Sequence, residues 1–182
     1  MRARRSAAAI SAVLACTAAP AAPVTVEAVR HGEAIDIRAS AQLQADGTTA
    51  WRVLTDYARY VDFIPHLRSC QVTARRGAVV TVQQEGEAAL WWFKLPVRVT
   101  YEITEQPPSR LQSHAIAGSL RSLDSVITLT PDGTGLRLDY SGRVVPGFAL
   151  PSALEQAAVE RNIGQQFQAL ADEIERQAGK AP

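Results

Sequence analysis

One long amphipathic stretch near the C-terminus, residues 152–178, limits the folds open to this chain. Its apolar residues recur every three or four positions and form one stripe of a 3.6-residue helix: Val159, Ile163, Phe167, Leu170 and Ile174. Ser152 with Glu155 forms a capping box at the start, and Gly179 marks the end. Such a helix spans roughly 40 Å, at about 1.5 Å per residue, and its stripe needs a covering surface of the same length.

Alternating apolar and polar residues separated by turn signals predict strands over most of the remaining chain. Two strands come before residue 46 and six after residue 66: 24–29, 34–43, 67–74, 78–87, 90–105, 110–117, 120–130 and 135–145. The turns include 31–33, 75–77, a small-residue break near Ala88, 106–109, Gly118 and 131–133. Short turns between consecutive strands predict antiparallel pairing, and therefore an α+β fold with a twisted sheet against the long helix.

A shorter helical segment follows the second strand. Thr48 or Thr49 is the expected N-cap, and Pro65 ends the segment. Trp51, Leu54, Tyr57 and Tyr60 are expected on one side of this helix.

The strand at 90–105 carries an unusual amount of apolar and aromatic volume on one face. Its alternation places seven side chains together: Trp91, Phe93, Leu95, Val97, Val99, Tyr101 and Ile103. Two later strands contribute similar faces, with Ser125 and Ile127 on one and Leu138 and Tyr140 on the other. We expect these faces to meet the helix stripe.

The first 22 residues differ in composition from the rest and resemble a bacterial export signal. Arg2, Arg4 and Arg5 precede a short apolar run that cannot span a bilayer. Two processing sites for the leader remain possible. One is cleavage after Ala21, and the other is lipoprotein processing before Cys16, because the residues preceding Cys16 resemble a lipobox. The sequence thus predicts a leader, residues 1–22, and one domain, residues 23–180, exported to the periplasm or envelope, with membrane association only through a lipid on Cys16.

Charge and motifs exclude several classes of function. The formal net charge is +1, and no basic stripe suited to nucleic acid follows the leader. His31, His66 and His114 match no metal-ligand spacing, and no hydrolase, zinc or phosphate-loop motif is present. We therefore expect no metal and no cofactor. Cys70, the only cysteine outside the leader, lies in a strand and is expected to be a buried apolar residue.

The segment Trp51–Cys70, WRVLTDYARYVDFIPHLRSC, followed by six strands and a long helix, resembles the START-like (SRPBCC) superfamily. Its polyketide cyclase/dehydrase and coenzyme Q-binding family is the most similar. The most specific matches lie between Trp51 and Leu67, with support from Leu123–Ser125. The resemblance implies a helix-grip fold, in which a curved antiparallel sheet wraps around the C-terminal helix and leaves a hydrophobic cavity between them. It also implies binding of quinones, lipids, sterols or polyketides, with catalysis in only some members.

From this resemblance and the strand patterns we expect a cavity lined from both the sheet and the helix, by Trp91, Phe93, Val97, Tyr101, Ser125, Ile127, Leu138, Tyr140, Ala157, Ile163, Gly164 and Phe167. The first half of the helix is rich in small residues, so the space is expected around residues 157–164.

The leading hypothesis is a monomer that binds, and carries or shields, a hydrophobic small molecule. The alternative is a cyclase or dehydratase in which Tyr101, Ser125 or Tyr140 supplies a proton. A third reading, an interaction module with a filled core, predicts no cavity.

Overall fold

The computed structural model describes residues 23–90, 93–147 and 152–180. Two strands, β1 (Val24–His31) and β2 (Ala34–Leu43), come first and are followed by helix α1 (Gly47–Thr55), the 3₁₀ turn η1 (Tyr57–Arg59) and the short helix α2 (Tyr60–Phe63). The remaining elements are β3 (Leu67–Arg76), β4 (Val79–Leu90), β5 (Phe93–Gln106), β6 (Arg110–Gly118), β7 (Leu120–Asp132), β8 (Gly135–Pro146) and α3 (Ser152–Ala178).

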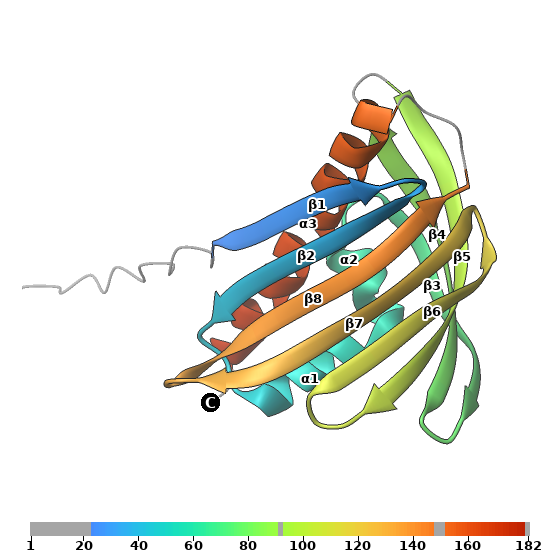
Figure 1. The fold of residues 1–182 in the computed structure, drawn as a ribbon. Coiled ribbons are helices and arrows are strands. Elements are labelled where there is room, and N and C mark those ends of the chain that lie inside the picture. Colours follow the sequence, from blue (N-terminus) through green and yellow to red (C-terminus); the bar gives the residue numbers. More distant parts are fainter. Residues whose placement is uncertain (1–22, 91–92, 148–151, 181–182) are drawn as a thin grey trace, which may run out of the picture.

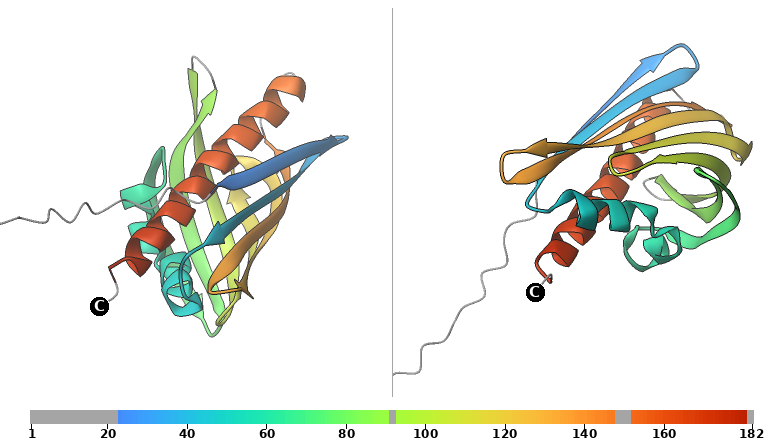
Figure 2. Two further views of the ribbon diagram at one scale, coloured as in Figure 1. Left: turned by 90° about the vertical axis from the view of Figure 1, so that its left-hand side faces the viewer. Right: turned by 90° about the horizontal axis from the view of Figure 1, so that it is seen from below.

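The strands form one antiparallel sheet in the order β1-β2-β8-β7-β6-β5-β4-β3 (Figure 1). The sheet curves around α3, and α1 and α2 lie beside the C-terminal half of that helix (Figure 2). Register shifts occur within the β3–β4, β5–β6 and β7–β8 pairs, where an extra residue bends the strand. This arrangement confirms the predicted α+β helix-grip fold.

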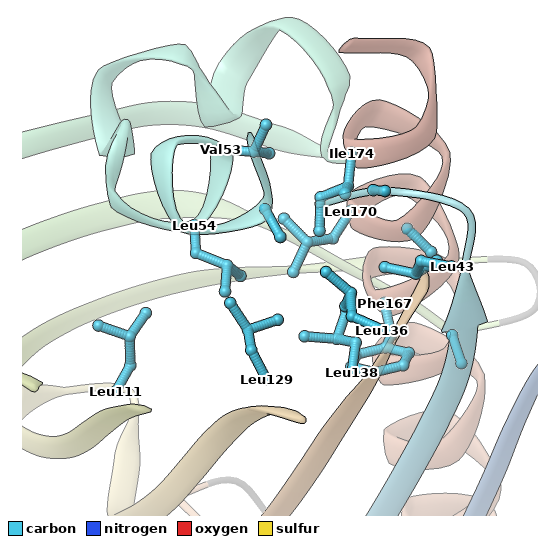
Figure 3. Close-up of a cluster of buried hydrophobic side chains, with 14 of the residues drawn as sticks. Leu43, Val53, Leu54, Leu111, Leu129, Leu136, Leu138, Phe167, Leu170 and Ile174 are labelled. Atoms are coloured by element: carbon cyan, nitrogen blue, oxygen red, sulfur yellow. The ribbon is translucent and has the colours of Figure 1, made fainter. Parts of the chain in front are cut away.

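The main hydrophobic core lies between the C-terminal half of α3, α1 and the sheet (Figure 3). Phe167, Leu170 and Ile174 of the predicted stripe are almost fully buried in it. From the sheet, Leu43 and Leu138 contribute side chains that are no more than 1% exposed. Burial of one such side chain contributes about 1.5–3 kcal/mol to folding, so this core fixes the position of α3.

A second, smaller cluster lies under the N-terminal half of α3, where Val159 and Ile163 pack against Ile37 and Val144. Strand β1 borders the helix here: Arg30 forms an ion pair with the buried Glu155 carboxylate, and Gln156 Nε2 donates to the Ala28 carbonyl at 2.8 Å. These contacts attach the first turns of α3 to the sheet edge. The side chain of Ser152 lies outside the described residues.

The helical segment after β2 differs from the prediction in two ways. Its N-cap is Asp46, whose carboxylate accepts from the Thr49 backbone N–H at 2.9 Å and from the Thr49 hydroxyl at 2.7 Å. The segment also divides into α1, η1 and α2, because the backbone leaves the helical conformation at Asp56. This break turns Tyr57 into the core at 2% exposure, with its hydroxyl donating to Glu105.

The predicted break near Ala88 is wrong. Strand β4 continues to Leu90, and Ala88 pairs with Leu95 in a ladder that reaches Leu90 and Phe93. The strand predicted over 90–105 accordingly begins at Phe93. Small residues here do not interrupt the strand because pairing within the sheet outweighs their weak β propensity.

Within the described residues, no helix is long and apolar enough to cross a membrane.

The Asp46 cap predicts an acid-sensitive contribution to stability. Hydrogen bonds from Thr49 lower the pKa of Asp46. Because the folded-state pKa is depressed, this contribution is fully present above the unfolded value of about 3.9 and is lost as the pH falls through the folded value. Asp46→Ala should lower the free energy of unfolding at pH 7 by about 1 kcal/mol.

The matched control is Asp46→Asn, which keeps a capping oxygen without a titrating group. Urea denaturation of Asp46→Asn between pH 7 and pH 3 should give a free energy of unfolding close to that of the wild type at pH 7. That free energy should fall less steeply on acidification than in the wild type. A loss as steep as that of the wild type would show that Asp46 is not the responsible group.

Candidate ligand-binding site

Two adjoining pockets lie between the curved sheet and the N-terminal half of α3. One, of about 140 Å³, is mainly apolar. The other, of about 110 Å³, reaches toward the loop between α2 and β3. The two pockets form two parts of one interior site, because they share six lining residues from β4, β5 and α3. These are Ala88, Val97, Val99, Tyr101, Asn162 and Gln166.

A larger hollow of about 560 Å³ lies on the outer face of the sheet, but its chemistry does not suit an apolar ligand. Its lining includes Asp36, Arg143, His114 and Asp124. These groups pair with each other: Arg143 contacts Asp36 at 2.9 Å, and His114 Nδ1 lies 2.6 Å from Asp124. Exposed pairs of this kind contribute little energy, and the surface is a solvated sheet face.

Tyrosine hydroxyls mark the polar part of the interior. Tyr101 lines both interior pockets, and burial, followed by the neighbouring Tyr140 and Cys70, raises its pKa. Burial also raises the pKa of Tyr140 to about 12, while a hydrogen bond with Ser125 opposes the rise. Both hydroxyls therefore remain protonated at neutral pH and can donate a hydrogen bond or a proton.

The Tyr140 side chain is positioned by its neighbours on two elements. Its ring packs against Phe167 of α3, with the ring centroids 6.4 Å apart. Gly142 leaves room for the hydroxyl, because a β-carbon at that position would lie 2.5 Å from the Tyr140 oxygen. Tyr101 and Tyr140 both contact the main core and the smaller cluster, so they lie at the boundary between packed core and pocket.

Cys70 is a structural rather than a reactive group. Its side chain is buried at 6% exposure, and Gln84 Nε2 lies 3.5 Å from the sulfur. Burial raises the pKa of the Cys70 thiol, which keeps it uncharged and unreactive at neutral pH.

The second pocket borders a close contact between the α2–β3 loop and β4. The His66 carbonyl accepts from the Glu87 backbone N–H at 3.0 Å, and His66 adopts a positive φ of 62°. Gly86 permits this approach, since a β-carbon there would lie 2.5 Å from the His66 oxygen. Beside it, the Glu87 carboxylate pairs with the exposed Arg68 and Lys94.

The sequence-predicted site residues fall into several groups. Val97, Tyr101 and Ile163 line the interior pockets. Ile127 and Tyr140 are partly buried against the main core, and Phe167 is buried within it. Ser125 bonds with Tyr140 and borders the outer hollow. Leu138 is fully buried in the main core, Ala157 is exposed, and Gly164 lies near Val26 of β1, where an added β-carbon would be 3.5 Å from the Val26 side chain. Trp91 and the side chain of Phe93 lie outside the described residues.

Several lining residues were missing from the predicted site. They are Ile37, Val99, Leu120, Leu123, Val144, Ala158, Val159, Asn162 and Gln166. The alternation of β2 and the helical spacing of α3 indicated that some of these side chains face inward, but not that they border a pocket. Their role depends on the space left between distant elements, which no local pattern reports.

The histidines lie apart. His31 is 3.7 Å from Asp36, His114 pairs with Asp124, and His66 is in the α2–β3 loop. In the part of the chain that the structure describes, no group of three or more histidine, cysteine, aspartate or glutamate residues could hold a metal ion.

Three solved structures with the same fold have similar TM-scores when compared with this chain. The Zhui aromatase/cyclase from Streptomyces sp. R1128 has a TM-score of 0.67 at 15% identity, covering 79% of this chain and 95% of that one. A STAR-related lipid transfer protein fragment from Xanthomonas axonopodis has a TM-score of 0.66 at 16% identity, covering 87% and 96%. The protein TTHA0849 from Thermus thermophilus has a TM-score of 0.66 at 17% identity, covering 79% and 99%.

A comparison with curated proteins found no significant match. The model of the family described as polyketide cyclase/dehydrase and lipid transport matches residues 43–171, which is most of the domain. The predicted START-like resemblance is therefore confirmed, and the chain belongs to the polyketide cyclase/dehydrase and lipid transport family.

Proposed function

We propose that this protein binds a hydrophobic small molecule in the interior pockets and carries or shields it at the bacterial envelope. The observation that carries the proposal is the apolar pocket of about 140 Å³ beneath α3, with the Tyr101 side chain on its wall. The proposed ligand is quinone-like, lipid-like or polyketide-like. Family membership and the fold shared with an aromatase/cyclase and a lipid transfer protein support the proposal.

The pocket volume limits the affinity that apolar contact supplies. Burying six ring carbons gives roughly 5 kcal/mol at about 0.8 kcal/mol each, which corresponds to a dissociation constant near 0.2 mM before association costs. A polar contact must therefore add affinity for a ligand of this size. The carrier function requires no placed acid or base, whereas catalysis does.

Filling the pocket from the helix tests where the ligand binds. Ala158 lines the pocket, so Ala158→Leu should weaken binding of the neutral fluorescent probe N-phenyl-1-naphthylamine by about tenfold or more. Ala157 is exposed on the same turn of α3, and Ala157→Leu is the matched control. Fluorescence titration of both folded variants gives the comparison. Equal affinities for the two would place the ligand elsewhere.

The leader and Cys16 lie outside the described residues, so envelope location rests on the sequence pattern alone. We expect export of the mature domain from its native type of host. Metabolic labelling with a fatty acid, compared between the wild type and Cys16→Ala, distinguishes the two forms of processing. A label that depends on Cys16 marks a lipid anchor, and an exported unlabelled chain marks cleavage after Ala21. A full-length chain retained in the cytoplasm contradicts the envelope proposal.

A cyclase or dehydratase is the second candidate, favoured by the grouping of Tyr101, Tyr140 and Ser125 beside the pocket. The two protonated tyrosine hydroxyls can donate hydrogen bonds to a substrate oxygen and stabilise charge that develops on it. Among the described lining residues of the two interior pockets, Glu87 is the only carboxylate, and it is paired with Arg68 and Lys94. If the protein is such an enzyme, Tyr140→Phe should abolish turnover of a polyketide-type substrate while the circular dichroism spectrum is unchanged. Full turnover in that variant would exclude Tyr140 as the donor.

A further inference from the structure

Tyr101 differs from the other tyrosines in its hydrogen bonding. The chain has four tyrosines, all within the described residues. Tyr57 donates to Glu105 at 3.1 Å, Tyr60 donates to the Leu54 carbonyl at 2.7 Å, and Tyr140 bonds with Ser125. The Tyr101 hydroxyl has no partner among the side chains and backbone groups that the structure describes. The hydroxyl is not among the fully buried, unpartnered polar atoms of the described residues, so it is accessible at the pocket wall and can bond to a ligand.

The pocket that Tyr101 lines has no charge to match an anionic ligand. The lining of the 140 Å³ pocket contains no lysine, arginine, aspartate or glutamate among the described residues. In the adjoining pocket, the ionisable groups besides Tyr101 are His66 and Glu87, and Glu87 is paired with cations on the surface. A carboxylate in the 140 Å³ pocket would lose hydration without gaining a cationic partner from its described lining, which disfavours its charged form.

The size of the site indicates a ring rather than a long chain. A dry apolar cavity of about 150 Å³ in another protein holds one benzene molecule. The two interior pockets here, about 140 and 110 Å³, are each of this order and adjoin at Tyr101. A fused two-ring compound therefore fits the interior with its polar atom near the Tyr101 hydroxyl.

We infer that Tyr101 is the specificity-determining hydrogen-bond donor of this site, and that the ligand is a neutral, ring-sized carbonyl compound rather than a carboxylate-bearing lipid. The hydroxyl remains protonated at neutral pH, so it can donate to a carbonyl oxygen. This inference rests on the proposed binding function and adds the ligand class and the residue that selects it.

The test uses three ligands that share one ring system: tetralin, 1-tetralone and 1,2,3,4-tetrahydro-1-naphthoate. Calorimetric titration at pH 7 compares the wild type with Tyr101→Phe. The variant should lose about tenfold in affinity for 1-tetralone, equivalent to one neutral hydrogen bond, and should keep its affinity for tetralin. Tyr60→Phe is the matched control, because it removes a hydroxyl that bonds to the backbone outside the pockets and should change neither affinity.

The wild type alone gives a second measurement if Tyr101→Phe does not fold. The tetrahydronaphthoate anion should bind at least about 100-fold more weakly than 1-tetralone, because the described lining of the apolar pocket offers it no cationic partner. Equal affinity of the ketone and the anion, or an unchanged 1-tetralone affinity in Tyr101→Phe, overturns the inference while leaving hydrophobic binding intact. Failure of both tetralin and 1-tetralone to bind the wild type overturns the inference together with the proposed binding of ring-sized ligands.

Discussion

The packing of the C-terminal half of α3 sets the geometry of the whole domain. Phe167, Leu170 and Ile174 are buried against the sheet and α1, and they hold the helix at a fixed distance from the strands. The N-terminal half of the same rigid helix must follow, and its side chains near the sheet include the small Ala158. The site therefore arises from uneven side-chain volume along one straight helix, with large residues at one end and smaller ones at the other.

Strand β1 supports this arrangement from the sheet edge. The family match begins at residue 43, so β1 and nearly all of β2 precede it. The ion pair between Arg30 and the buried Glu155 and the hydrogen bond from Gln156 to Ala28 attach the first turns of α3 to β1. A buried carboxylate is costly without its partner, so these contacts favour one position of the helix.

Charge is distributed to separate an ionic exterior from a neutral interior. The ion pairs of Arg143 and Arg98 and the contact between His114 and Asp124 lie on exposed surfaces of the sheet. The described lining of the apolar pocket carries no lysine, arginine, aspartate or glutamate, and in the adjoining pocket Glu87 is paired with Arg68 and Lys94. Burial keeps Tyr101, Tyr140 and Cys70 protonated. Such a site favours neutral ligands with a hydrogen-bond acceptor, and it supplies donors more readily than bases.

The elements that depend on local periodicity follow from the sequence alone. The stripe of α3, the alternation of the strands and the short turns predicted the long helix and the antiparallel order, because these patterns reflect burial on one face. Contacts between distant segments determined the rest. The N-cap of α1 is Asp46 rather than a threonine, and β4 continues through Ala88. Leu138 lies in the core, whereas Val97 and Tyr101 border the pockets. The reason is physical: alternation specifies which face of a strand is buried, but a pocket forms only where side chains from distant elements together leave space.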